Sequence, residues 1–165
     1  MKSEKNCKCL PNSEMHNCFG CSPTNPSGLQ MKFYTNDSSV FSEIMVPKHL
    51  CGWNNLIHGG VLSTILDEIM SWAAIYLLKR ITLTKSMTID FLKPVTIEQA
   101  LRAEGKLVEF KGKNEAVMEG TLSNSDGTIC TRSTANLAIF SPAVAKRLRI
   151  ADEEHLNWFE RMYNI

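Results

Sequence analysis

A His-Gly-Gly triplet, His58-Gly59-Gly60, opens a strongly apolar stretch of the chain, and an acidic pair, Asp67 and Glu68, interrupts that stretch about two and a half helical turns later. The N–H groups of a first helical turn have no partner within the helix, and two glycines leave them uncovered. The helix dipole adds partial positive charge there, so an oxyanion would be stabilised at this point. Oxyanion donors together with an isolated carboxylate predict acyl transfer or hydrolysis.

Of the two acids, Asp67 is the better candidate for a catalytic carboxylate. Apolar residues flank the pair on both sides, so a carboxylate here is costly unless it is paired or used. Glu68 lies about 100° further round the helix and can be the solvated member of the pair. We keep Glu68 as the reserve acid and as a candidate for binding the substrate.

Composition restricts the classes of function. A chain of 165 residues with 44% apolar and 21% charged residues predicts one globular domain. The net charge of +1, with Lys and Arg scattered, predicts no nucleic-acid partner. The apolar run Ile69–Leu78 is shorter than the roughly 18–20 residues that span a bilayer, so no membrane association is expected. The first residues contain no apolar signal segment, which predicts a cytoplasmic protein.

Four of the six cysteines lie in the first 21 residues, as Cys7-x-Cys9 and Cys18-x-x-Cys21. Without a signal peptide they indicate either reduced thiols or a metal clip, with His16 between the two pairs. One CxC and one CxxC are weaker evidence than two CxxC pairs at zinc-ribbon spacing. We therefore expect half-buried thiols and no metal. Cys51 and Cys130 are isolated, which favours a place in the core.

The first half of the chain contains the helix that must position these groups. Residues 1–28 hold Pro and Gly without an apolar period, which predicts an irregular, cysteine-rich N-terminal arm. Leu29–Tyr34 and Val40–Val46 alternate and predict a hairpin. A loop over residues 48–57 precedes a helix from Gly60 to about Leu78, where apolar residues recur every three or four positions.

The second half predicts strands joined by short turns, an order that favours an antiparallel sheet. The expected strands are Thr82–Phe91, Ala100–Phe110, Glu115–Ser123 and Thr128–Phe140. Ser141 followed by Pro142 is a helix start, and Asp152 can cap another helix that runs to about Tyr163. The predicted organisation is the arm at 1–28, an α+β domain at 29–140 and a C-terminal helical tail at 141–165.

Three segments together resemble the hotdog-fold acyl-CoA thioesterases, and in particular the phenylacetic-acid-degradation type within the 4-hydroxybenzoyl-CoA thioesterase-like superfamily. They are Cys18-Phe19-Gly20-Cys21 with Asn25-Pro26-x-Gly28-Leu29, then His58-Gly59-Gly60 to Asp67, and finally Met87-Thr88-Ile89-Asp90-Phe91-Leu92-Lys93-Pro94-Val95. Each segment is modest alone, but their order and spacing are specific. The likeness covers residues 16 to 140.

This resemblance implies a single hotdog domain, in which a five- to six-stranded antiparallel sheet wraps around one long helix. It also implies a homodimer or a dimer of dimers, with active sites where two subunits meet. The Gly59 amide would polarise the thioester carbonyl, and Asp67 of the partner subunit would activate water or attack the carbonyl. Thr84 lies nearest to the place where relatives carry an assisting Ser or Thr. No cofactor is implied.

The loop before the helix departs from the family pattern. Relatives often carry an Asn six residues before the His to orient the water, and Gly52 stands there in this chain. Asn54 and Asn55 are near enough to substitute if the loop is shaped differently, and we take Asn55, with Gly60, as a candidate for substrate binding. The His58 side chain either contacts the substrate or bonds to the backbone of the helix start.

The leading prediction is a thioesterase that hydrolyses an acyl-CoA, or an acyl-carrier-protein thioester, to a free acid and a thiol. The alternative is a non-catalytic sensor that binds acyl thioesters. A sensor normally needs an output domain, for which 165 residues without a helix-turn-helix leave no room. A hotdog dehydratase would need a His–Asp pair elsewhere.

Overall fold

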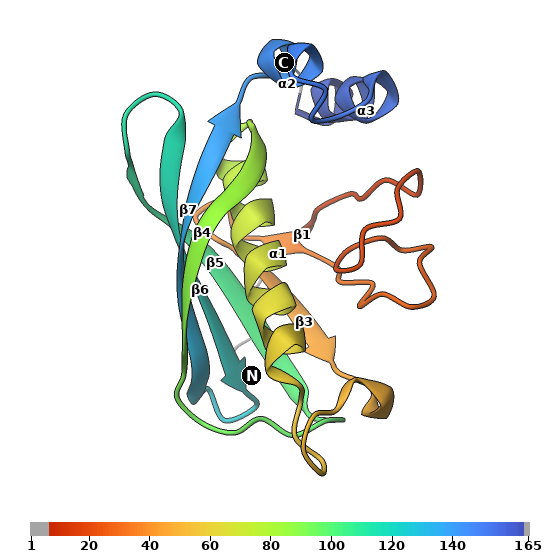
Figure 1. Ribbon diagram of the computed structural model, residues 1–165, viewed down its shortest axis with the longest axis vertical. Helices are drawn as coiled ribbons and strands as arrows, with labels where there is room; N and C mark the ends of the chain where they lie inside the picture. The colour runs from red at the N-terminus through yellow and green to blue at the C-terminus, as the bar shows by residue number, and fades with distance from the viewer. Residues whose placement is uncertain (1–6, 164–165) are drawn as a thin grey trace.

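The computed structural model describes residues 7–163 as an α+β fold in which one antiparallel sheet curves around a long helix (Figure 1). The strands are β1 (Lys8–Cys9), β2 (Tyr34–Thr35), β3 (Val40–Met45), β4 (Ile81–Phe91), β5 (Ala100–Phe110), β6 (Glu115–Asn124) and β7 (Ile129–Phe140). The helices are the 3-10 turn η1 (Lys48–Leu50), the central α1 (Gly59–Leu78), α2 (Pro142–Arg147) and α3 (Glu153–Tyr163). The predicted fold class is thereby confirmed.

The sheet has seven strands in the order β1-β2-β3-β5-β6-β7-β4. Every neighbouring pair is antiparallel. The sequence predicted five or six strands, and the additional one is the two-residue β1, which the N-terminal arm adds at one edge. Strand β4 forms the other edge of the sheet. Among the residues that the structure describes, its outer side has no strand partner.

Helix α1 buries its apolar side against the concave face of the sheet, and glycine on the strands lets the two backbones approach closely. A Cβ atom at Gly105 on β5 would come within 2.5 Å of the Ile69 carbonyl oxygen, so only glycine allows this close approach. The most buried helix residues, Ile65, Leu66, Ile69 and Met70, form the centre of the core. By length and composition alone α1 could also span a membrane, but half of it is buried within the fold, as in the core helix of a globular protein.

The four strands predicted for the second half of the chain are all present, each within one residue of the expected ends. The first strand of the predicted hairpin is largely wrong. Only Tyr34–Thr35 pairs with β3, while the segment before it bonds to the arm instead. Leu29 N–H donates to Phe19 O and Met31 N–H to Gly20 O, and between them Gln30 has a positive φ of 49°. The alternation of apolar and polar residues in this segment could not show whether its backbone would bond to β3 or to the N-terminal arm.

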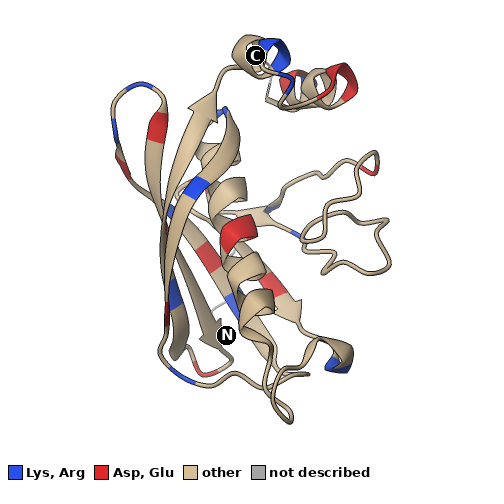
Figure 2. Cartoon of the chain, viewed as in Figure 1, with Lys and Arg blue, Asp and Glu red and all other residues tan. Residues whose placement is uncertain are grey.

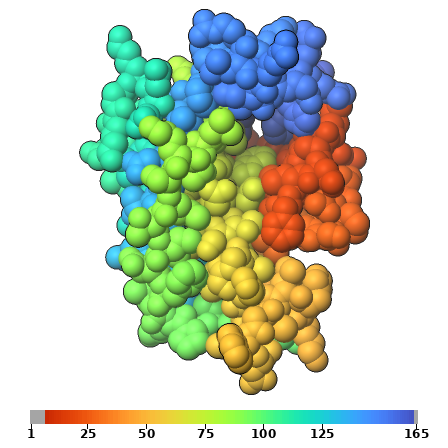
Figure 3. Space-filling model, viewed as in Figure 1, coloured from red at the N-terminus to blue at the C-terminus, as the bar shows by residue number. Residues whose placement is uncertain are grey.

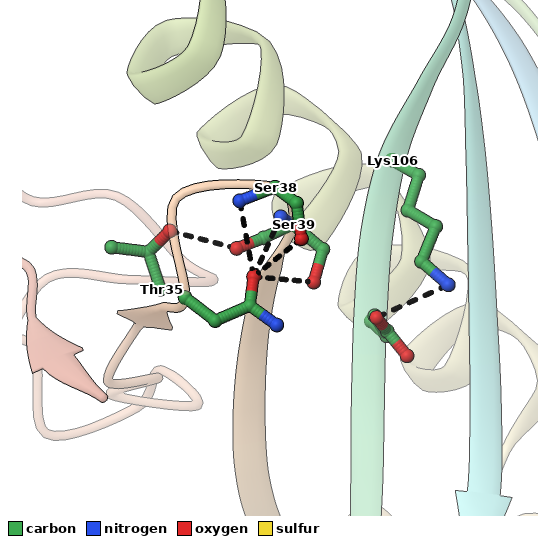
Figure 4. A network of polar contacts seen from close by, with 6 residues as sticks. Thr35, Ser38, Ser39 and Lys106 are labelled. Carbon is green, nitrogen blue, oxygen red and sulfur yellow. Dashed lines mark hydrogen bonds and ion pairs between the residues drawn. The ribbon is translucent and has the colours of Figure 1, made fainter. Parts of the chain in front are cut away.

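The turn between β2 and β3 is held by its own side chains (Figure 4). The Asn36 side-chain oxygen accepts from the backbone N–H groups of Ser38 and Ser39 at 3.1 and 2.9 Å. The Thr35 hydroxyl donates to Ser39 O at 2.8 Å.

The same view shows an ion pair on β5, where Lys106 Nζ lies 3.2 Å from Glu104 Oε1.

The C-terminal helices begin as predicted. Ser141 caps α2 by accepting from Val144 N–H, and Asp152 caps α3 by accepting from His155 N–H at 2.8 Å. The end of α3 reaches the end of α1, where the Lys79 ammonium lies between the rings of Tyr76 and Tyr163.

The N-terminal arm also packs directly on α1, as the space-filling view shows for one face (Figure 3). The expected division at residues 28 and 140 stays a prediction, and its outer ranges include residues 1–6 and 164–165, which lie outside the described part of the chain.

Candidate active site

The start of α1 presents one free backbone donor. His58 is the N-cap residue, and its Nδ1 accepts from Gly60 N–H at 2.9 Å. The Gly60 amide is therefore already bonded within the protein. The Gly59 amide has no acceptor among the described residues, and Gly59 is exposed. Of the groups predicted at this helix start, the structure leaves Gly59 N–H available for an oxyanion and gives the His58 side chain a capping role.

Two hollows open beside this amide, and Gly59 lines both. One, of about 210 Å³, is apolar and lies between the start of α1 and the end of β4, where Leu62, Phe91 and Val95 contribute to its wall. The other, of about 530 Å³, is formed by the loop before the helix, from Cys51 to Gly59. A group bound to the Gly59 amide therefore has apolar space next to it, as an acyl chain or a pantetheine arm requires.

Asp67 and Thr84 form a second centre on the side of α1 that faces β4. Thr84 Oγ1 donates to Asp67 Oδ1 at 2.6 Å, and solvent reaches both side chains. The pairing of β4 with β7 shifts register between Thr84 and Ser86, and such a bulge re-aims the neighbouring side chains. The sequence predicted both residues for the site, and the structure brings them together.

The Gly59 amide and Asp67 of the same chain are too far apart to act on one carbonyl group. Eight residues separate them along a continuous helix, and a rise of 1.5 Å per residue puts them about 12 Å apart. A reacting carbonyl lies roughly 3 Å from its oxyanion donor and from its base or nucleophile. Within one chain these two groups therefore do not meet at the same carbonyl carbon.

Glu68 is on a different side of the helix from Asp67. Its carboxylate lies under the N-terminal arm, 3.2 Å from the Cys18 sulfur. In Figure 2 the acidic pair is the one charged segment along the visible face of α1, with the arm beside it. Burial, followed by the charge of Cys18, raises the pKa of Glu68 to about 8. The structure therefore places the Glu68 carboxylate apart from the Asp67–Thr84 pair, and its role in substrate binding stays a prediction.

The loop before α1 contains no group that matches a water-orienting Asn. Gly52 N–H donates to Leu56 O at 2.8 Å, and a Cβ atom at Gly52 would lie 3.3 Å from His58 Cα, so a larger side chain would press on the N-cap. Asn55 is exposed, and its backbone oxygen accepts from Ile97 N–H at 2.9 Å. Among the described residues, Asn55 is thus held through its backbone, and it does not line either hollow.

Sequence reasoning missed one cluster altogether. The two cysteines of Cys18-x-x-Cys21 meet the Glu68 carboxylate, with all three ligand atoms within 4.8 Å of one another. The Cys21 thiol, with the amides of Cys21 and Gly20 and with Glu68, lowers the pKa of Cys18 to about 4. The shared hydrogen bond and burial raise the pKa of Cys21. The CxxC spacing was visible in the sequence, but its third member lies 47 residues away.

Comparison with known proteins bears on the fold and the family. The family model of the thioesterase superfamily matches residues 54–131, a segment that begins just before the His-Gly-Gly helix start and ends within β7. The match covers 78 of the 165 residues, so this segment is similar to the thioesterase superfamily. The resemblance inferred from the sequence is confirmed.

Among curated proteins, acyl-coenzyme A thioesterase THEM4 of Rattus norvegicus is 28% identical over 87 residues, which are 53% of this chain. The chain spans 37% of the length of that relative.

Two solved structures show the shared fold. A hypothetical thioesterase of Streptococcus pneumoniae with coenzyme A has a TM-score of 0.58 and 24% identity, with 62% of this chain and 81% of that chain covered. The E. coli PaaI protein from the phenylacetic acid degradation operon has a TM-score of 0.61 and 17% identity, with 68% and 81% covered. Variants of the S. pneumoniae protein with one Asp or one Thr replaced by Ala match as well.

Proposed function

We propose that this protein is an acyl-CoA thioesterase whose active sites form between two copies of the chain. The observation that carries the proposal is the Asp67–Thr84 hydrogen bond of 2.6 Å at the open β4 edge, together with a free Gly59 amide at the start of the same helix. The coenzyme A in the S. pneumoniae structure and the name of the rat relative support an acyl-CoA substrate.

In this mechanism the thioester carbonyl oxygen accepts from Gly59 N–H, where the helix dipole stabilises the developing negative charge. The partner subunit's Asp67 removes a proton from water, and the resulting hydroxide adds to the carbonyl carbon. The tetrahedral intermediate then expels the thiolate, which recovers the proton from the Asp67 carboxyl group. If Asp67 instead attacks the carbon directly, the thiolate leaves from a mixed anhydride, which water then hydrolyses. In both routes Thr84 holds the carboxylate in position.

The edge strand β4 is the surface through which we expect the two copies to pair. It is eleven residues long and carries Leu83 and Phe91, which are 48% and 55% exposed. A long edge strand with exposed apolar side chains is a template for pairing, and soluble proteins cover such edges. Pairing of β4 with its symmetry mate would also bring Asp67 and Thr84 of each chain to the interface. We propose a homodimer, or a dimer of such dimers.

The test is a thiol-release assay over a panel of short, long and aromatic acyl-CoA substrates, with Asp67→Asn compared with the unchanged protein. Asn keeps the size of Asp but removes its charge and basicity, so kcat should fall by roughly 10²–10⁴-fold. Asp126→Asn, in the turn between β6 and β7, is the matched control and should retain kcat. Glu68→Gln should cost far less turnover than Asp67→Asn.

Four results would contradict the proposal. Near-normal turnover of Asp67→Asn would remove the carboxylate mechanism, and loss of turnover only in Glu68→Gln would show that the wrong acid was chosen. If the unchanged protein binds acyl-CoA but hydrolyses no member of the panel, the chain is a binding protein. Hydrolysis of acyl-carrier-protein thioesters alone would replace CoA as the carrier.

A further inference from the structure

The N-terminal arm brings two cysteine thiols onto the Glu68 carboxylate. Cys18 Sγ lies 3.2 Å from Glu68 Oε1, and the sulfur of Cys21 completes a group whose ligand atoms are all within 4.8 Å of one another. Cys18 and Glu68 are partly buried, and Cys21 is buried. These residues come from segments 47 residues apart, so the cluster is a product of the tertiary fold.

The loop that carries the two cysteines is held in place by its backbone. Ser22 N–H donates to Cys18 O at 3.2 Å, and the two residues between the cysteines accept from the chain that follows: Phe19 O from Leu29 N–H at 2.8 Å and Gly20 O from Met31 N–H at 3.1 Å. The cysteines are therefore presented to the helix by a bonded loop.

Gly20 shows how closely this loop approaches the carboxylate. A Cβ atom at Gly20 would lie 2.2 Å from Glu68 Cγ and 2.6 Å from Oε1, so any larger residue would displace the Glu68 side chain on which the turn rests. Closing a CxxC turn directly over an acid is a costly arrangement for a structure that needs only to fill space, because small apolar residues would do that without desolvating a carboxylate.

Glu68 has no salt-bridge partner near the cluster. Within residues 7–163 no Lys, Arg or His forms an ion pair with Glu68, and the neighbouring residue on the helix is another acid, Asp67. Two sulfur ligands and a carboxylate match the donor set of a thiophilic divalent cation.

We propose that Cys18, Cys21 and Glu68 bind a zinc ion, which fastens the N-terminal arm to the central helix α1. Zn–S bonds of about 2.3 Å and Zn–O bonds of about 2.0–2.2 Å place tetrahedral ligand atoms roughly 3.5–3.8 Å apart, so small side-chain shifts suffice. This reverses our expectation from the sequence that the thiols hold no metal. Cys7 and Cys9, which a four-cysteine clip would require, are both exposed and are not part of the cluster.

The three residues supply three ligands, which leaves the fourth position of a tetrahedral site to solvent. His16 is the nearest further candidate in sequence, but its ring is engaged elsewhere: Nδ1 accepts from Cys18 N–H at 3.3 Å, and Nε2 bonds with Asn12 Oδ1 at 3.0 Å. The Glu68 carboxylate meets the N-terminal arm while Asp67 meets Thr84, so the zinc would tie the arm to α1 and would not join the Asp67–Thr84 pair. The inference is independent of the proposed thioesterase activity.

The experiment measures zinc in the full chain, purified in reducing buffer without chelator, by mass spectrometry of the metal. We expect close to one zinc per chain. Cys18→Ser, Cys21→Ser and Glu68→Gln should each weaken zinc binding roughly tenfold or more. The matched controls are the double variant Cys7→Ser/Cys9→Ser and the single variant Cys130→Ser, which should keep the zinc of the unchanged protein.

A second measurement covers variants that fail to fold. The unchanged protein, stripped with chelator and titrated with Co²⁺, should develop the charge-transfer absorption of a cobalt–thiolate complex, and Zn²⁺ should protect two thiols from a thiol reagent. Protein that contains no zinc and binds neither ion overturns the proposal. A Cys18–Cys21 disulfide in the purified protein overturns it in favour of a redox pair. Loss of zinc in Cys7→Ser/Cys9→Ser, with retention in Glu68→Gln, overturns it in favour of a four-cysteine clip.

Discussion

Replacing Gly59 with proline isolates the contribution of a single backbone N–H group. Gly59 is the first residue of α1, the one helical position where proline is well accommodated. His58 has ψ of 135°, in the extended region that a residue before proline prefers. The Gly59 N–H has no acceptor within residues 7–163, so its removal breaks no bond of the fold. A Cβ atom there would lie 3.7 Å from the Phe91 ring, an ordinary contact.

The expected effect of Gly59→Pro on turnover is large, whereas its effect on stability is small. Loss of one oxyanion donor costs roughly 10²–10³-fold in kcat, or about 2.7–4 kcal/mol. Proline in a compatible position changes stability by about 0.4–1 kcal/mol, in the stabilising direction, through the unfolded chain. The assay is kcat by thiol release, with the melting temperature measured in parallel. Gly59→Ala is the control, because it adds the same Cβ but keeps the N–H, and should stay near normal turnover.

Mixing two inactive variants tests whether the site is shared between chains. If Gly59 N–H and Asp67 act from different subunits, a Gly59→Pro chain and an Asp67→Asn chain complement each other in a mixed dimer. After dissociation and reassociation of a one-to-one mixture, half of the dimers are mixed and each has one intact site, so about a quarter of the normal activity should return. Equal turnover of Gly59→Pro and Gly59→Ala would refute the oxyanion role, and a mixture as inactive as its components would refute the shared site.

Three further outcomes are expected. Thr84→Val removes the hydroxyl that donates to Asp67 but keeps the shape of the side chain, so kcat should fall roughly tenfold. Thr84→Ser keeps the hydroxyl and should retain most of the normal kcat. Equal kcat values for the two variants would exclude a positioning role for Thr84. Gly105→Ala places a Cβ 2.5 Å from the Ile69 carbonyl oxygen and should lower the free energy of unfolding by about 1–3 kcal/mol in urea, more than Gly120→Ala, whose Cβ meets the flexible Met70 side chain. The backbone N–H and the ring of His155 lower the pKa of Asp152, so the cap of α3 is present above the ordinary pKa and is lost as the pH falls through the lowered value. Hydrogen exchange of α3 should therefore accelerate below about pH 4. Asn caps a helix without titrating, so Asp152→Asn should remove that dependence.

Where a pattern is local, the sequence alone was sufficient. The strands β4 to β7 were predicted within one residue, because alternation over ten or more residues between turn-forming segments has one interpretation. Helix α1 was predicted from its three-and-four spacing and its glycine start. Helical geometry separated Asp67 from Glu68 by about 100°, which left Glu68 either as the solvated member of the pair or as the reserve acid.

Whatever depends on which segments meet was decided by the tertiary structure. Residues 29–33 alternate like a strand, yet their backbone bonds to the arm because the loop at Phe19 and Gly20 lies alongside them. Glu68 looked like a second substrate-site acid until the fold placed the CxxC loop over it. Hydrophobic periodicity records which side of an element is buried, because burial acts on each residue in its own segment. It carries no record of the partner that covers that side, since the partner lies tens of residues away and is selected by packing of the whole chain.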